Sequence, residues 1–283
     1  MIHSVAIRNP IARVRFIRAL LTACTLAIVT CGSVFGAGNT HDQLLRSLAR
    51  AVVNEDSASL QRLLTPANIR RLDSAERCDL MLGLIEHKRL SGLKTAIRSG
   101  LDPNQPLRFE HEGEWTTLTP LNFALGAHDD PAVALLLIDL GADVNQQSVD
   151  DNPPLFTALA WHALPVIKRL LAAGANANAR DRLNGTTPLM VAVGRKNRSD
   201  PLEIAQLLLD HGADIHAKTR TGHTALMFAA KANNQPAIDW LLKHGADAST
   251  MAANGDSLNT INNRNADYDM LRMLLGDPQP SGR

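Results

Sequence analysis

Two short tags recur in phase along the chain, and this repetition limits the possible folds more than any other feature. The first tag resembles Gly-Ala-Asp, and its copies lie roughly 33 to 41 residues apart, a period typical of stacked repeats. Its glycines are Gly100, Gly141, Gly174, Gly212 and Gly245. The second tag resembles Thr-Pro-Leu and precedes the last four glycines, starting at Thr119, Pro153, Thr187 and Thr224. Two tags at a nearly constant separation indicate one structural unit that is repeated along the chain.

The repeat at residues 221–250 indicates how such a unit folds. Thr224 can cap a first helix, whose first position carries proline in other repeats. Pro236 opens a second helix, and Gly245 ends that helix because glycine tolerates the left-handed backbone conformation. The pattern therefore predicts a helix-turn-helix unit in which Leu226 is buried.

These motifs resemble the ankyrin repeat, which has a period of ~33 residues and the signature T-P-L-H-x-A. The matching segments include Thr187-Pro188-Leu189-Met190-Val191-Ala192 and Thr224-Ala225-Leu226-Met227-Phe228-Ala229. Methionine replaces the histidine of the signature in both, Asn122 replaces it in an earlier repeat, and Pro153 replaces the threonine of another. The family bonds neighbouring loops through its Thr–His pair, and the substitutions leave that network without one partner. The resemblance implies an all-α solenoid of stacked helix-turn-helix units with β-hairpin-like loops.

The repeats divide the chain into four parts. Two insertions stand out, since Gln105–Trp115 lengthens the loop before the first clear repeat and Gly194–Pro201 lengthens a link between two helices. Insertions in repeat proteins map to loops, which also tolerate neutral drift. The expected parts are a signal peptide at 1–37, degenerate N-terminal repeats at 38–104, four clear repeats at 105–250 and a degenerate C-terminal cap and tail at 251–283.

The first 37 residues have the layout of a secretory signal peptide. Four arginines and no acid precede an apolar run from Ala19 to Val29, and small residues follow up to Ala37. We therefore expect export to a bacterial periplasm, with the membrane involved only through this signal. The alternatives are an uncleaved N-terminal anchor and a lipoprotein attached at Cys24 or Cys31. A cleaved chain would keep Cys78 alone and could form no intramolecular disulfide.

Composition excludes several kinds of function. The net charge is +1, from 29 Lys+Arg against 28 Asp+Glu, so no basic excess exists to bind nucleic acid. We found no phosphate loop, paired-cysteine site or nucleophile motif, and we therefore expect no enzyme, no cofactor and no small-molecule substrate. Four late histidines are not expected to bind a metal, and two of them, His211 and His244, are expected to occupy the same solvent-facing position in successive repeats. Cys78 is expected to be a small buried hydrophobe.

The resemblance implies a protein partner, bound on the concave face by the loop tips and the exposed side of the first helices. Tryptophan and arginine are enriched at energetically important contacts. We expect Trp240 to face the core instead. The candidate contact residues are Trp115, Asp150, Trp161, His162, Arg182, Arg195, Arg220, His223 and Lys231.

Charge along this face is divided, since basic residues crowd the later repeats and acidic residues the earlier ones. Such a division indicates either a partner of complementary charge or an ordinary solvated surface. The predicted function is a non-enzymatic periplasmic adaptor, and the alternative is an inhibitor or immunity protein that blocks a toxin or enzyme.

Overall fold

The computed structural model describes residues 40–111, 114–127, 131–147, 152–161, 164–194, 201–255 and 257. The predicted signal peptide and all but the start of the predicted C-terminal cap lie outside these residues. The chain divides into two compact units, Met1–His162 (unit 1) and Ala163–Arg283 (unit 2).

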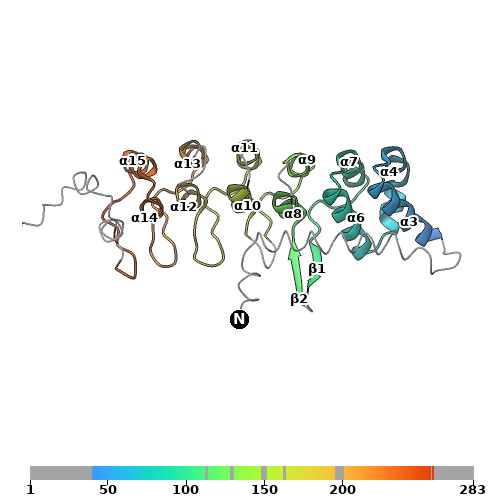
Figure 1. The fold of residues 1–283 in the computed structure, drawn as a ribbon, viewed down its shortest axis with the longest axis horizontal. Coiled ribbons are helices and arrows are strands. Elements are labelled where there is room, and N and C mark those ends of the chain that lie inside the picture. The colour runs from blue at the N-terminus through green and yellow to red at the C-terminus, as the bar shows by residue number, and fades with distance from the viewer. Residues whose placement is uncertain are drawn as a thin grey trace, which may run out of the picture. The chain divides into compact units, whose positions relative to one another are not determined.

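The described part of unit 1 contains eight α-helices and one β-hairpin, and Figure 1 shows how they are arranged. The helices α6, α8 and α10 form one row, and α4, α7 and α9 form a second row beside it. The elements are α3 (Thr40–Val53), α4 (Ser57–Leu63), α5 (Pro66–Arg71), α6 (Ser74–Glu86), α7 (Leu90–Arg98), β1 (Leu107–His111), β2 (Glu114–Leu118), α8 (Pro120–Ala127), α9 (Ala132–Asp139) and α10 (Pro154–Trp161).

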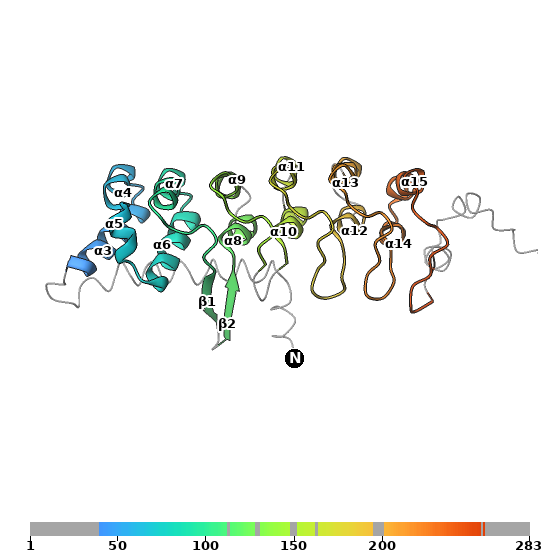
Figure 2. The same ribbon diagram turned by 180° about the vertical axis from the view of Figure 1, so that it is seen from behind.

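Unit 2 repeats this arrangement with five described helices (Figure 2). The first helices α12 and α14 pack against each other, as do the second helices α11 with α13 and α13 with α15. Each first helix also packs against the second helix of its own repeat. The elements are α11 (Leu164–Ala172), α12 (Pro188–Val193), α13 (Pro201–Asp210), α14 (Ala225–Lys231) and α15 (Gln235–Lys243).

Local chemistry sets the ends of these helices. The side-chain oxygens of Thr187 and Thr224 accept hydrogen bonds from the backbone N–H groups of Met190 and Met227, which are otherwise unsatisfied at a helix start. At the other end, all five tag glycines have a positive φ, between 81° and 105°. A Cβ atom added to any of these five would meet nothing within 4 Å, so backbone conformation rather than space requires glycine there.

The core lies between the two rows of helices and between successive first helices. In α14 the side chains of Leu226, Ala229 and Ala230 are at most 1% exposed, because α12 and α15 both pack against this helix. In α15, by contrast, the buried residues are confined to Ala237, Ile238 and Leu241. Small residues on the first helices allow the repeats to approach closely.

The insertion Gln105–Trp115 is more regular than a lengthened loop. Together with the residues that follow it, it forms the antiparallel hairpin of β1 and β2, in which Leu107 pairs with Leu118. Cys78 on α6 contacts the base of this hairpin, because the backbone N–H of Arg108 lies 3.4 Å from its sulfur. Of the second insertion, residues 195–200 lie outside the described part of the chain.

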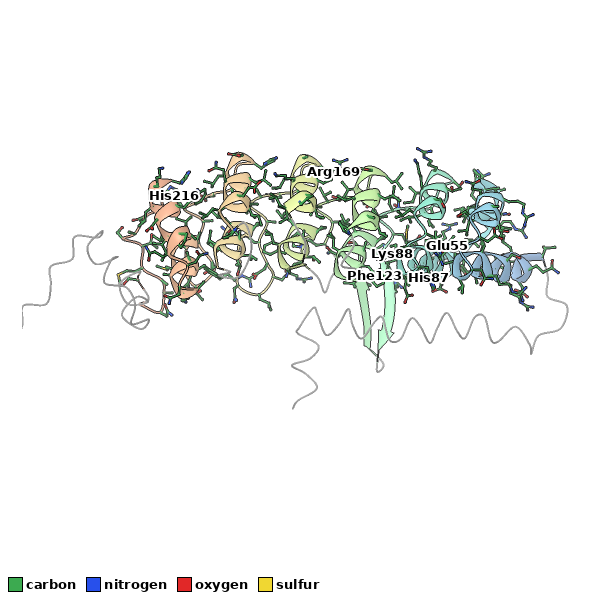
Figure 3. The ribbon with its side chains drawn as sticks, turned by 45° about the horizontal axis from the view of Figure 1, so that its top comes forward. Glu55, His87, Lys88, Phe123, Arg169 and His216 are labelled. Carbon is green, nitrogen blue, oxygen red and sulfur yellow. The ribbon has the colours of Figure 1, made fainter. Side chains whose placement is uncertain are left out.

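The turn between the two helices of a repeat has a recurring geometry. Glu55 and Lys88, both labelled in Figure 3, adopt left-handed backbone conformations although neither is glycine, and so does Asn233. In two of these three turns the side chain of the next residue donates to the end of the first helix of the preceding repeat. Arg89 donates to the carbonyl oxygens of Val52 and Val53 at 2.7 and 3.0 Å, and its guanidinium lies 2.8 Å from the Glu55 carboxylate. Likewise, Asn234 donates to Val193 O at 3.0 Å.

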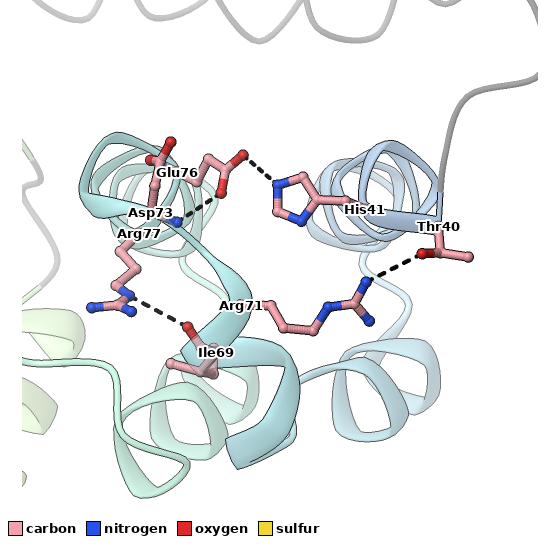
Figure 4. A network of polar contacts seen from close by, with 7 residues as sticks. All are labelled: Thr40, His41, Ile69, Arg71, Asp73, Glu76 and Arg77. Atoms are coloured by element: carbon pink, nitrogen blue, oxygen red, sulfur yellow. Dashed lines mark hydrogen bonds and ion pairs between the residues drawn. The ribbon is translucent and has the colours of Figure 1, made fainter.

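A polar network joins α3 to the start of α6 (Figure 4). One carboxylate oxygen of Glu76 lies 2.8 Å from His41 Nε2, and the other accepts the backbone N–H of Asp73 at 2.8 Å. The Asp73 side chain in turn accepts the backbone N–H of Glu76, which completes a capping box. Glu76 therefore caps its own helix and holds α3 in place.

Candidate functional site

Three long loops of unit 2 project on the side of α12 and α14, away from the second helices (Figure 2). We call residues 176–186, 214–223 and 247–255 the first, second and third finger loops. Backbone hydrogen bonds join them in series. Arg220 N donates to Asn184 O at 2.8 Å, and Ala253 N donates to Thr221 O at 2.9 Å. The tips of the finger loops are therefore fixed relative to one another.

Two arginines strengthen this junction. Arg180 Nη1 donates to Gly185 O in its own loop at 3.1 Å and to Lys218 O in the second loop at 2.6 Å. Arg220 Nη1 reaches back in the opposite direction, to Arg182 O at 2.9 Å and to Leu183 O at 3.0 Å. The two guanidinium groups therefore connect the first two finger loops and are themselves held in position.

The exposed surface of these loops combines positive charge with an apolar side chain. Leu183 at the tip of the first loop is 77% exposed. Arg182 beside it and Lys218 in the second loop are exposed, as is Lys231 at the end of α14. Asp181, in contrast, accepts hydrogen bonds from the backbone N–H groups of Asn184 and Thr186 at 2.8 and 3.0 Å, so its carboxylate stabilises the turn.

At the base of the loops, asparagine side chains connect successive repeats. Asn178 Oδ1 accepts the backbone N–H of Asp214 at 2.7 Å, and its amide donates to Gly212 O at 2.7 Å. In unit 1 Asn104 makes the corresponding bonds to the turn at residues 141–143. This role of the asparagines is not among the sequence predictions above. The available signal was an asparagine four residues after the tag glycine.

The missing histidines of the signature are replaced by other groups. In α12 the Met190 sulfur lies 3.4 Å from the backbone N–H of Thr187 and takes the place of a polar acceptor. In unit 1 the side-chain amide of Asn122 donates to Asn152 O of the next loop at 2.8 Å, and its oxygen accepts from Thr157 at 3.4 Å. The bonding between neighbouring loops therefore persists at Asn122.

The structure describes six of the nine candidate contact residues. Trp115 lies on β2, and Trp161 is the last residue of α10. Arg182, Arg220 and Lys231 are exposed on unit 2. The candidates Asp150, His162 and Arg195 lie outside the described residues.

Two expectations about aromatic residues need correction. His223 is only 8% exposed, because its ring nitrogen lies 2.9 Å from the Thr221 hydroxyl and its backbone N–H bonds to the Thr219 hydroxyl. Its side chain holds the second finger loop and is not an exposed contact. Trp240 does not fill the core either. It is half-buried and stacks on His244, with ring centroids 4.0 Å apart.

The described residues also bear on metal binding, cysteine reactivity and membrane spanning. Within the described residues, no group of three or more His, Cys, Asp or Glu side chains could hold a metal ion. His211 and His244 are exposed as expected, and each Nδ1 lies within 2.9 Å of the carbonyl oxygen four residues earlier. Cys78 is buried, and burial raises the pKa of its thiol, which keeps it protonated and unreactive at neutral pH. None of the helices in the described ranges has the length and apolar character that crossing a membrane requires.

Comparison with known proteins agrees with this architecture. A family model for ankyrin repeats in three copies matches residues 155–252. An ankyrin repeat protein of fowlpox virus is 32% identical over 132 residues, 45% of this chain and 37% of the viral protein. Protein PhlB of Serratia liquefaciens is 38% identical over 120 residues, 42% of this chain and 50% of PhlB. The chain thus spans half or less of the length of these two relatives.

Among solved structures, the crystal structure of the ankyrin repeat domain of Bcl-3 is similar, with a TM-score of 0.62. Its sequence is 24% identical, and the match covers 76% of this chain and 92% of that domain. The likeness confirms the predicted fold class. Residues 155–252 thus match the ankyrin-repeat model, and the chain has the ankyrin-repeat fold.

Proposed function

We propose that this chain is a non-enzymatic adaptor that binds another protein in a bacterial periplasm through its finger loops and first helices. The observation that carries the proposal is the hydrogen-bonded series of finger loops in unit 2. Long loops are ordinarily mobile, and ordering them on binding costs free energy. Loops that are already fixed avoid much of that cost, and these loops present exposed Arg182, Leu183 and Lys218.

The proposed location rests on the amino-acid pattern of residues 1–37. Basic residues, a short apolar run and small residues follow one another there, as they do in secretory signals. The apolar run from Ala19 to Val29 is shorter than the about 20 residues of a typical membrane-spanning helix. These features support export with cleavage over permanent anchoring.

Cross-linking and capture of the full chain in periplasmic extract tests the adaptor function. The informative variant is Arg182→Glu with Lys231→Glu, because both side chains are exposed on the proposed contact surface. The matched control is Lys168→Ala with Arg169→Ala on α11, a second helix of the same unit. We expect the wild type and the control to capture the same protein, and the charge-reversed variant to lose it at an unchanged melting temperature.

Three results would change this conclusion. A partner lost from the α11 variant and kept by the charge-reversed variant would move the contact surface to the second helices. Absence of any specific partner from the wild type would refute the adaptor function. A captured enzyme or toxin whose activity falls when it is bound would identify an inhibitor instead.

A further inference from the structure

We propose that the finger loops of unit 2 recognise an acidic protein segment that carries an apolar side chain. This inference rests on the proposed function and specifies the chemistry of the partner. It is drawn from two independent features of the same loops, the distribution of exposed apolar side chains and the anchoring of the arginines.

The most exposed large apolar side chains of the described residues lie on finger loops. Leu183 on the first loop is 77% exposed and Met251 on the third is 66% exposed, whereas Leu90 and Val53 in unit 1 are 40% and 36% exposed. Exposed apolar groups gain from burial against a partner, and they act as anchors when polar groups surround them. The backbone of Leu183 lies next to a cation, since its carbonyl oxygen accepts a hydrogen bond from Arg220 Nη1 at 3.0 Å.

The arginines around Leu183 are arranged to receive carboxylates. Arg180 and Arg220 flank the turn at Gly185, where a Cβ atom would lie 3.4 Å from Arg220 Cγ and 3.7 Å from Arg180 Nη1. All four bonds described above use Nη1, so they do not engage the Nε–Nη2 edge, which forms bidentate pairs with carboxylates. An arginine that is already held in place loses less side-chain entropy when it binds such a group.

The arginines and lysine of the first two finger loops outnumber their acidic residues, four to two. Asp214 and Asp247 lie at the bases of the second and third loops, where each accepts a backbone N–H two residues later. Asp181 accepts two backbone N–H groups within the turn of the first loop. Exposed Arg182 and Lys218 add to the positive charge of the tips. An acidic segment with an apolar residue complements both the cations and Leu183.

The charge balance of the chain favours a peptide segment over a polyanion. The net charge of +1 gives the chain no basic excess for binding a phosphate backbone. The positive charge is instead concentrated on the first two finger loops, which also carry the exposed Leu183. A phosphate group would satisfy the guanidinium groups and leave Leu183 in water.

Fluorescence anisotropy with the full chain tests this recognition directly. The probe is a fluorescein-labelled peptide of alternating glutamate and leucine, and the control peptide has glutamine in place of glutamate. We expect the glutamate peptide to bind about tenfold or more tightly than the glutamine peptide at low salt, with the difference shrinking as salt rises. Leu183→Ser should weaken binding of the glutamate peptide about tenfold, whereas Leu90→Ser, an exposed leucine in unit 1, should leave it unchanged.

A second charge variant avoids the arginines that connect the loops. Arg182→Gln with Lys218→Gln removes two exposed cations without removing the Arg180 and Arg220 side chains. We expect this variant to bind the glutamate peptide several-fold more weakly and to melt at the wild-type temperature. Equal binding of the two peptides, or no effect of Leu183→Ser, would overturn the inference. Displacement of the glutamate peptide by millimolar inorganic phosphate would show a simple anion site and would also overturn it.

Failure of this inference can be told apart from failure of the adaptor function. If Leu183→Ser still captures the wild-type partner from periplasmic extract, the adaptor function stands and the inference fails. If the wild type binds the glutamate peptide in the expected way but captures no protein, the inference stands and the adaptor function fails.

Discussion

At the scale of single residues, enclosure by neighbouring helices distinguishes side chains of the same type. Leu226 and Leu183 are both leucines of unit 2, yet Leu226 is 1% exposed and Leu183 is 77% exposed. Leu226 lies on α14, which packs against both α12 and α15, whereas Leu183 lies at a loop tip. The two positions should therefore respond very differently to truncation.

We expect Leu226→Ala to lower the free energy of unfolding by about 2–5 kcal/mol, because it leaves a cavity in a close-packed interior. Leu183→Ala should change it by less than about 0.5 kcal/mol, since that side chain is already in water. Urea unfolding followed by circular dichroism measures both values. An unchanged midpoint for Leu226→Ala would mean that the first helix of this repeat is wrongly placed.

At the scale of helices and loops, stability depends on side chains that reach from one repeat to the next. Three arginines donate hydrogen bonds to carbonyl oxygens of a neighbouring helix or loop. They are Arg89 in unit 1 and Arg180 and Arg220 in unit 2. These carbonyls lie at a helix end or in a loop, where the regular hydrogen bonds of a helix are missing. Arginine thus has a structural role at positions where its charge alone would indicate a binding role.

Replacing Arg89 by alanine should loosen α3 selectively. The substitution removes hydrogen bonds to Val52 O and Val53 O together with the contact to Glu55. We expect a loss of about 1–3 kcal/mol, in line with the cost of leaving acceptors without a donor. Hydrogen exchange measured by mass spectrometry should rise in residues 40–53 and stay unchanged in α14. Lys94→Ala, at an exposed position on α7, is the control and should alter neither region.

The elements that could be predicted from the sequence are those set by local chemistry. Thr187 and Thr224 cap helices, and Gly245 ends one, through interactions within a few residues. His223 and Arg220 could not be assigned in the same way. Their burial and hydrogen bonds depend on how closely neighbouring segments approach, which no single repeat encodes. The hairpin of β1 and β2 likewise carries no local tag, and its base contacts α6 through Cys78, far away in the sequence.

At the scale of the whole molecule, helices pack against helices of the same repeat or of an adjacent repeat. Within unit 2 these are the contacts of α11 with α13, α12 with α13 and α14, and α15 with α13 and α14. Folds built from such nearest-neighbour contacts gain stability by adding repeats, and terminal repeats commonly differ from the central ones. The first 37 residues have a different composition, and we expect them to serve export instead.

We expect the exported protein to begin between Gly36 and Gly38. The removed segment contains four arginines and no acidic residue, so cleavage changes the net charge from +1 to −3. N-terminal sequencing of the periplasmic fraction measures the start, and isoelectric focusing measures the change in charge. A chain that starts at Met1 in the cytosolic fraction would contradict export. Lipid attached to Cys31 would establish the lipoprotein alternative.

The tag glycines have a stereochemical consequence. Gly212 has a φ of 81°, and the place that the Cβ atom of an L-residue would take is open, so backbone conformation alone disfavours an L side chain there. An L-alanine would be strained by about 1–2 kcal/mol in this left-handed conformation. A D-alanine, whose preferred φ is positive, avoids this backbone strain and restricts the unfolded chain, and we expect it to stabilise by about 0.4–1 kcal/mol. Semisynthetic proteins that carry each enantiomer at position 212 should therefore melt on opposite sides of the natural protein.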